Sequence, residues 1–251
     1  MRKAKYWKYT ACIALVTACS SDPTRSPTGS QAAQQLKRGT CPNSIIDSRG
    51  RDGRGNVRYE GSLTPTQITD YRNREISNCT AKLNTGNTRA LATLVAYYDH
   101  SGQAVDLVRT LEVYADTGSD PSKLRDTGTY LYSAYDAGQS GVPQDSDKAF
   151  KYLGLAVNNG SADLQLDYAR ELNRRGLHSD ALRFYQGIAR ADTRSLEDRC
   201  QAKLSLGELY FGGSPAIENW NIGYYYWQQG LAMAENRRWA SCSKDNFTSP
   251  N

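Results

Sequence analysis

Apolar residues recur at helical spacing through most of the chain beyond residue 64, and a glycine ends each run. Leu91, Leu94, Val95 and Tyr98, for example, fall on one stripe of a helix, and Gly102 follows them. Each short helix of this kind leaves an apolar face uncovered, so neighbouring helices must stack to bury it. The pattern therefore predicts an all-α chain made of stacked helical hairpins.

The first helix of the series has clear sequence signals at both ends. Thr64 can cap its start, Pro65 suits the first helical position, and Gln67 completes a capping box. Gly86 is the expected stop, and Cys79 lies on the apolar stripe between them. A later run, before Gly118, predicts a buried stripe made of Val105, Val108, Leu111 and Tyr114.

One unit of about 30 residues occurs in two recognisable copies, at residues 131–160 and 206–232. Residues 166–189 form a more degenerate unit between them, and residues 88–118 form a weaker one. The matching positions are Leu131, Tyr135, Gly138, Gly141, Asp145, Lys148, Ala149, Tyr152, Ala156 and Gly160 in the first copy, and Leu206, Gly207, Tyr210, Gly223, Tyr226, Trp227, Gly230 and Leu231 in the second.

These positions resemble the Sel-one-like repeat, a relative of the tetratricopeptide repeat. The first copy departs from the repeat pattern by having Tyr132 in place of a glycine and one extra residue before Gly141. The resemblance implies an αα-hairpin repeat solenoid whose curved surface binds other proteins. The residue chemistry agrees with this fold, because small residues such as Ala149 and Ala156 let paired helices approach closely.

The N-terminus has the features of a secretory leader. Four basic residues precede an apolar stretch over residues 9–18, which is too short to span a membrane. The sequence Val16-Thr17-Ala18-Cys19 resembles a bacterial lipobox. This resemblance implies removal of residues 1–18 and lipidation of Cys19, and Ser20 favours sorting to the outer membrane. We therefore expect a lipid-anchored protein that faces the periplasm.

Removal of the leader changes what the net charge means. The whole chain has a formal net charge of +5, but residues 1–18 contain four of the 31 basic residues and none of the 26 acidic ones. The mature chain is therefore nearly neutral, and its composition gives no reason to expect a nucleic-acid partner. The expected partners are instead the membrane, through the lipid, and proteins of the cell envelope.

Four cysteines remain once Cys12 and Cys19 are set aside. Because an exported chain meets an oxidising environment, an even number of cysteines indicates structural disulfides. Three pairings are open, and we favour Cys41–Cys79 and Cys200–Cys242, since each pair lies within one end of the chain. Their spacing matches neither a zinc site nor a redox motif.

The expected organisation has five parts. A basic stretch within the third part contains Arg49, Arg51, Arg54 and Arg58. It is interpreted as a solvated basic loop, and contact of these arginines with peptidoglycan or an anionic polysaccharide is the alternative. The parts are a signal peptide (1–18), a flexible tether (19–40), a small irregular disulfide-stapled segment with a helix (41–87), the repeat array (88–242) and a tail (243–251).

No catalytic pattern stands out, so we expect a protein that is not an enzyme and that uses no metal or cofactor. The chain has two histidines, His100 and His178, which are interpreted as surface residues near helix ends, with Ser179 capping the helix after His178. Glu197 and Asp198 suit the first turn of a helix better than acid–base chemistry. The sequence alone does not identify a pair of glycosidase carboxylates.

Aromatic residues gather near the end of the array, over residues 220–227. Tyr226 and Trp227 match packing positions of the repeat. Adjacent residues on a helix are 100° apart, so neighbouring rings cannot all face inward. Trp220, Tyr224 and Tyr225 are therefore the candidate partner-binding residues, and packing against the next helix or the C-terminal segment is the alternative.

The resulting hypothesis is a scaffold that accompanies envelope assembly, secretion or exopolysaccharide export, as the alginate-export lipoproteins do. Two alternatives remain open. One is a cell-wall-facing regulator or inhibitor of a peptidoglycan enzyme that uses the basic residues 49–58. The other is an enzyme with an unrecognised carboxylate site.

Overall fold

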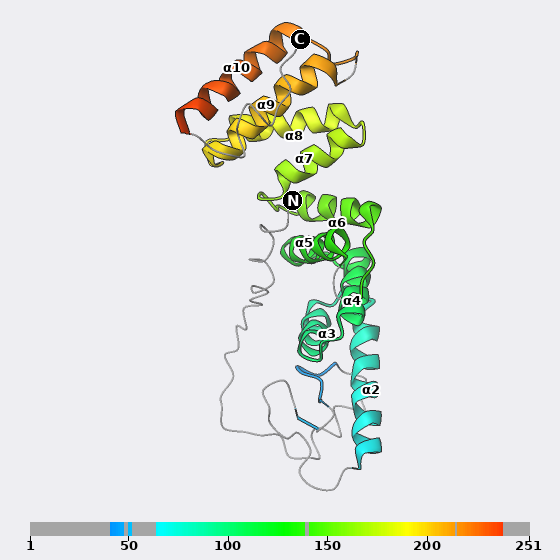
Figure 1. Cartoon of the computed structure of the whole chain (residues 1–251). Coiled ribbons are helices and arrows are strands. Elements are labelled where there is room, and N and C mark those ends of the chain that lie inside the picture. The colour runs from blue at the N-terminus through cyan, green and yellow to red at the C-terminus, as the bar shows by residue number, and fades with distance from the viewer. Residues whose placement is uncertain (1–40, 48–49, 52–63, 139–140, 214, 238–251) are drawn as a thin grey trace. The chain divides into compact units, whose positions relative to one another are not determined.

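In the computed structural model, residues 41–47, 50–51, 64–138, 141–213 and 215–237 are described, and within these ranges every regular element is an α-helix (Figure 1). This confirms the all-α class. The chain divides into two compact units, residues 1–160 and 161–251. The first contains α2 (Pro65–Leu83), α3 (Thr88–His100), α4 (Ala104–Thr117), α5 (Pro121–Ala137) and α6 (Ser146–Asn158), and the second contains α7 (Gln165–Arg174), α8 (His178–Arg190), α9 (Leu196–Gly212) and α10 (Trp220–Arg237).

Helix α2 begins where the sequence predicts. The Thr64 hydroxyl accepts a hydrogen bond from the Gln67 N–H at 3.3 Å, and the Gln67 side-chain oxygen accepts one from the Thr64 N–H at 2.8 Å. This reciprocal pair satisfies two donors that a helix start otherwise leaves without partners. Toward the end of α2 the fully buried Cys79 forms a disulfide with Cys41, so the favoured pairing of these two cysteines is confirmed.

Helices α3 and α4 pack on each other and supply much of the core of the first unit. The stripe expected on α4 is wrong at its first member, because Val105 is 40% exposed whereas Leu107 is buried. Val108, Leu111 and Tyr114 are buried as predicted. Leu107 and Leu111 lie four residues apart on one side of the helix, and with Val108 and Tyr114 they make a continuous face that excludes Val105.

The α5–α6 hairpin explains most of the repeat positions in residues 131–160. Gly138 ends α5 in the left-handed conformation, with φ of 64°, which a glycine adopts without steric cost. The Asp145 carboxylate caps α6 by accepting hydrogen bonds from the N–H groups of Asp147 and Lys148. The two helices touch at Gly128, where an added Cβ would lie 2.7 Å from the backbone nitrogen of Ala156. Close backbone contact is therefore built into this hairpin.

In the second unit, α7 packs on α8, α8 on α9 and α9 on α10. The expected Ser179 cap is wrong, because α8 begins at His178 and no side chain caps it. The His178 ring nitrogen Nδ1 instead lies 2.8 Å from the Asn173 side-chain oxygen, which fastens the helix start to α7. Ser195 caps α9, and Glu197 and Asp198 occupy its first turn, where negative charge is favourable.

Candidate functional site

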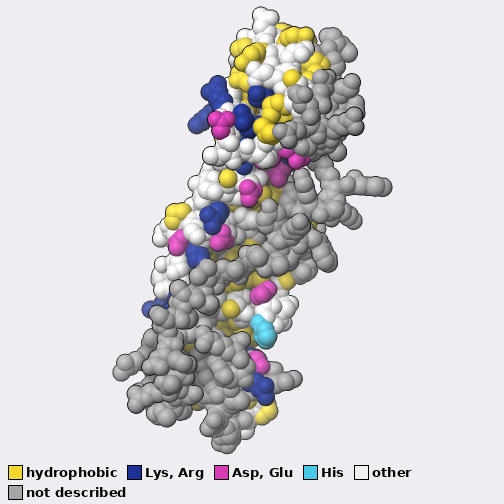
Figure 2. All heavy atoms as spheres, turned by 90° about the vertical axis from the view of Figure 1, so that its left-hand side faces the viewer, with side chains coloured by type: hydrophobic (Ala, Val, Ile, Leu, Met, Phe, Trp, Pro, Cys, Tyr) yellow, Lys and Arg dark blue, Asp and Glu magenta, His cyan; other side chains and the backbone are white. Residues whose placement is uncertain are grey.

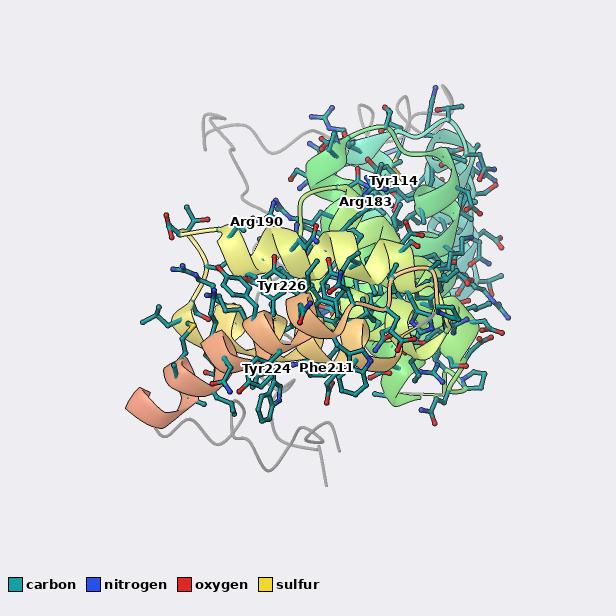
Figure 3. The ribbon with its side chains drawn as sticks, turned by 90° about the horizontal axis from the view of Figure 1, so that it is seen from above. Tyr114, Arg183, Arg190, Phe211, Tyr224 and Tyr226 are labelled. Carbon is teal, nitrogen blue, oxygen red and sulfur yellow. A yellow bond between two sulfur atoms is a disulfide. The ribbon has the colours of Figure 1, made fainter. Side chains whose placement is uncertain are left out.

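The α9–α10 hairpin is held by close backbone contact at three glycines. A Cβ on Gly207 would lie 2.9 Å from the Cβ of Trp227, and one on Gly230 would lie 2.6 Å from the Leu204 side chain. A Cβ on Gly223 would lie 2.8 Å from the Phe211 ring. Helices this close leave no room between them for many large rings, so the aromatic residues of α10 divide between its two flanks. Figure 3 shows Tyr224 on one side of α10 and Tyr226 on the other.

One flank of α10 is packed against the rest of the second unit. The Tyr226 ring stacks on the Tyr210 ring of α9, with centroids 6.1 Å apart and planes within 3° of parallel. The Tyr210 hydroxyl accepts a hydrogen bond from the Gln186 amide of α8 at 3.1 Å. Tyr226 therefore has the packing role that the repeat pattern predicts.

The other flank carries an aromatic stripe, which we define as Phe211, Trp220, Tyr224 and Trp227. The three α10 members are spaced four and three residues apart, so they share one helix face. The Trp220 ring lies 5.2 Å from the Phe211 ring, and the Tyr224 ring lies 6.5 Å from that of Trp227. Trp227 also packs on the core that Cys200, Leu204 and Ala234 form between α9 and α10. Within the stripe, Trp227 is therefore packed against this core, whereas Trp220 and Tyr224 are exposed.

The outer part of α10 is unusually exposed for aromatic residues. Trp220 is 51% exposed, Tyr224 is 55% exposed and Tyr225 is 60% exposed. Ile222 beside them is also exposed, and Figure 2 shows hydrophobic side chains grouped on the surface of the second unit. No charged residue occurs between Trp220 and Ala234. Abundant aromatic side chains with few charges are the composition of protein–protein interfaces rather than of ordinary surface.

The three aromatic residues chosen from the sequence are therefore exposed as expected, and their use in partner binding stays a prediction. Cys200 is buried and disulfide-bonded, but its predicted partner, Cys242, lies outside the described residues. Cys19, the tether over residues 19–40 and the tail over residues 243–251 also lie outside them. Of the four arginines in residues 49–58, Arg51 is described and is exposed.

The first unit contains a polar cluster that sequence reasoning missed. One oxygen of Glu112 on α4 accepts hydrogen bonds from the Tyr135 hydroxyl of α5 at 2.7 Å and from the Lys148 ammonium of α6 at 2.9 Å. The Tyr152 hydroxyl donates to the same oxygen at 3.2 Å. The Tyr135 and Tyr152 rings stack with centroids 5.8 Å apart. The cluster joins three helices, so we interpret it as a structural fastening.

The electrostatics of this cluster agree with a structural role. Burial opposes ionisation of Glu112, but hydrogen bonds from Tyr135 and Lys148 outweigh it and hold the pKa of this carboxyl below its ordinary value. Hydrogen bonds to Tyr135 and Glu112 raise the pKa of Lys148. Both groups are therefore held in their charged forms at neutral pH, as partners in an ion pair.

Tyr210 and Gln186 repeat the arrangement of Tyr135 and Glu112 without its charges. In each case a polar side chain on the preceding helix meets the hydroxyl of a tyrosine, and that ring stacks on a second tyrosine. Tyr135, Lys148 and Tyr152 all occupy positions of the repeat pattern, which is the signal from which the cluster could have been found. Glu112 lies outside that unit, so the pattern did not include it.

The histidines and the paired carboxylates lie at helix ends. His100 is the last residue of α3, and His178 is the first residue of α8. Among the described residues, no three His, Cys, Asp or Glu side chains are grouped so that they could hold a metal ion. No helix in the same part of the chain has the length and hydropathy needed to cross a membrane.

Comparison with known protein families, with curated proteins and with solved structures finds no match to this chain.

Proposed function

We propose that this chain is a lipid-anchored binding protein of the bacterial envelope, without catalytic activity, that holds a partner protein on the aromatic flank of α10. The observation that carries this proposal is the exposure of Trp220, Tyr224 and Tyr225 on a helix that has no charged residue from Trp220 to Ala234. An accessory role in envelope assembly, secretion or exopolysaccharide export fits such a protein.

The physical properties of the aromatic stripe support binding to a protein. Trp and Tyr rings supply large contact areas and lose little side-chain entropy when they are immobilised. Trp220 is already oriented, because its Nε1 donates to the Glu218 carboxylate at 3.0 Å and its ring packs on Phe211. A partner that covers these rings therefore gains burial at a small ordering cost. Such anchors dominate the binding energy of many interfaces.

The repeat architecture supports the same proposal. Two hairpins, α5–α6 and α9–α10, each combine a contact at glycine with a stacked tyrosine pair, as copies of one unit would. We therefore propose that the helical pairs are Sel-one-like repeats of a solenoid. A repeat at the end of such an array has a face that no neighbouring repeat covers, and α10 belongs to the last described hairpin.

The proposed anchor is Cys19, acylated after removal of residues 1–18 and held in the outer membrane. Two or more acyl chains give stable attachment, because each buried methylene contributes about 0.8 kcal/mol. Replacing Cys19 with alanine in the full-length protein should abolish acylation and release the chain from the membrane fraction. Acylation of the Cys19→Ala protein would show that the anchor is elsewhere.

Site-specific cross-linking tests the binding surface directly. A photoreactive amino acid at position 224 or 225 of the full-length protein, expressed in its own cells, should give one discrete adduct with another envelope protein. The same amino acid at Leu177, which is 44% exposed on a different part of the second unit, is the matched control. We expect the adduct at 224 or 225 to disappear when Trp220→Ala is added. Equal cross-linking at 177, or no effect of Trp220→Ala, would contradict the proposal.

A further inference from the structure

The first unit contains an open cavity of about 410 Å³, which lies outside the surface used in the proposed function. It is formed where residues 44–47 and Arg51 lie against α2, α3 and the start of α4. Its volume falls within the range of small-ligand sites. Its lining includes Ile45, Asp47, Arg51, Arg72, Tyr97 and His100.

The wall made by residues 41–47 is fixed in place by several independent contacts. The Cys41–Cys79 disulfide attaches it to α2, and the Thr93 hydroxyl of α3 donates to the Pro42 carbonyl at 3.0 Å. The Ile46 N–H donates to the buried Glu75 carboxylate at 3.1 Å. Ile45 and Ile46 are themselves buried. A wall held in this way is preorganised, so a ligand need not order it on binding.

The charges on the lining are unbalanced. Arg51 and Arg72 both line the cavity, and within the described part of the chain neither guanidinium forms an ion pair or a hydrogen bond. Elsewhere in the same unit, by contrast, Lys148 and Lys151 are paired with carboxylates at 2.9 and 3.3 Å. Asp47 also lines the cavity, and one of its carboxylate oxygens accepts the Arg51 backbone N–H at 2.9 Å. Among the described residues, the lining therefore includes two arginines and one carboxylate, and that carboxylate is already engaged.

The rest of the lining indicates the ligand class. Guanidinium groups match carboxylates in bidentate geometry, and they lose little hydration when they bind. Ile45, Ala96 and Tyr97 offer apolar contact beside the arginines, whereas Ser44, Ser101 and Gln103 offer groups that can hydrogen-bond to amides. A ligand with a carboxylate, an adjacent apolar side chain and a peptide bond can contact the arginines, the apolar residues and the polar residues of the lining, respectively.

We propose that this cavity binds the free C-terminal carboxylate of a peptide whose last side chain is apolar, with Arg51 and Arg72 as the carboxylate-binding residues. The terminal side chain contacts Ile45 and Tyr97, and the preceding amide meets the polar rim. This site differs from the aromatic stripe in both position and chemistry, so either can fail without the other.

The test is calorimetric titration of the full-length protein in detergent with an acetylated leucine-terminated tripeptide, as its free acid and as its C-terminal amide. We expect the acid to bind and the amide to bind at least about tenfold more weakly, because it lacks the charge that the arginines recognise. Arg72→Gln and Arg51→Gln should each weaken binding of the acid by about tenfold, and Arg72→Lys by less.

Arg89→Gln is the matched control, because Arg89 is an exposed arginine on α3 that does not line the cavity. It should leave the affinity unchanged. Circular dichroism melts of the arginine variants establish that they fold. Equal affinity for acid and amide, an equal loss with Arg89→Gln, or tighter binding of glucuronic acid than of the peptide acid would overturn the proposal.

Discussion

The α5–α6 and α9–α10 hairpins place the same tyrosine pair in different chemical surroundings. In the first, Tyr135 and Tyr152 stack beside Glu112 and Lys148, which are both charged. In the second, Tyr210 and Tyr226 stack beside the neutral Gln186. Ile222 lies 36 residues after Gln186, just as Lys148 lies 36 residues after Glu112. The exposed Ile222 of α10 therefore occupies the position at which the first hairpin has Lys148.

The comparison distinguishes the interactions that both hairpins share from those that differ between them. The contact at glycine and the stacked rings hold a hairpin together in either setting. The charges of Glu112 and Lys148 fasten the first hairpin to α4, whereas the neutral Gln186 and Ile222 occupy the corresponding positions of the second. We infer that stability resides in the shared elements and that binding resides in the elements that differ.

The largest expected effect comes from the shared glycine contact. Gly128→Ala places a Cβ 2.7 Å from the backbone nitrogen of Ala156 and 2.9 Å from the Tyr152 carbonyl oxygen, and neither atom can move alone. We expect the free energy of unfolding, measured with urea, to fall by about 2 kcal/mol. Gly187→Ala is the control, because a Cβ there meets nothing within 4 Å. It should raise stability by about 0.5–1 kcal/mol, the helix propensity of alanine over glycine. Equal effects of the two changes would refute close packing at Gly128.

The next test compares the two tyrosine hydroxyls. Tyr135→Phe removes a hydrogen bond that the hydroxyl donates to a carboxylate and should cost about 1.5–2 kcal/mol. Tyr210→Phe removes one that the hydroxyl accepts from an amide and should cost about 1 kcal/mol or less. Both variants keep the stacked ring, so the difference reports the charge. Urea unfolding of both proteins measures it. A larger loss for Tyr210→Phe would show that the charged cluster contributes less than its geometry indicates.

A smaller effect is expected in the dependence of stability on pH. Because the folded-state pKa of Glu112 is lowered, its ionised form stabilises the fold above the unfolded pKa of about 4.3, and this contribution is lost as the pH falls through the folded pKa. Glu112→Gln should therefore flatten the decline in melting temperature on the acid side of about pH 5. Asp106→Asn serves as the control, since Asp106 forms an exposed pair with Arg109 at 3.5 Å. An unchanged acid limb in Glu112→Gln would contradict the proposed ion pair.

The smallest effect tests whether the hairpins are interchangeable. Gln186→Glu combined with Ile222→Lys places in the second hairpin the charges of the first. A double-mutant cycle should give a favourable coupling of about 0.5 kcal/mol, as for a partly exposed ion pair. The same double variant should weaken the α10 cross-link, because it adds charge beside the aromatic stripe. Zero coupling would show that residues 186 and 222 do not correspond to residues 112 and 148.

Local features were predictable from the sequence because their causes are local. The capping box at Thr64, the stop at Gly138 and the cap at Asp145 each depend on neighbouring residues. The division of the α10 rings also followed from the 100° step of a helix.

Features that depend on contacts between distant residues were not predictable in this way. The run Val105, Leu107, Val108 allows two apolar faces, and only the packing of α4 selects Leu107. The Glu112 cluster joins residues up to 40 positions apart, and the cavity depends on where residues 44–47 and Arg51 meet α3. Neither has a signature in the spacing of residues along the chain.

The Cys41–Cys79 disulfide has a mechanical consequence for the proposed attachment at Cys19. A pull transmitted along the chain to Cys41 passes through the two sulfurs to Cys79 near the end of α2, and the covalent bridge bypasses the loop between these cysteines, whose sequence separation is 38. Arg51 and Arg72 both lie inside that loop. Tension on the proposed lipid anchor would therefore be transmitted at Cys79 to the end of α2 and onward to α3 and α4. It would not be transmitted along the loop that contains the two arginines.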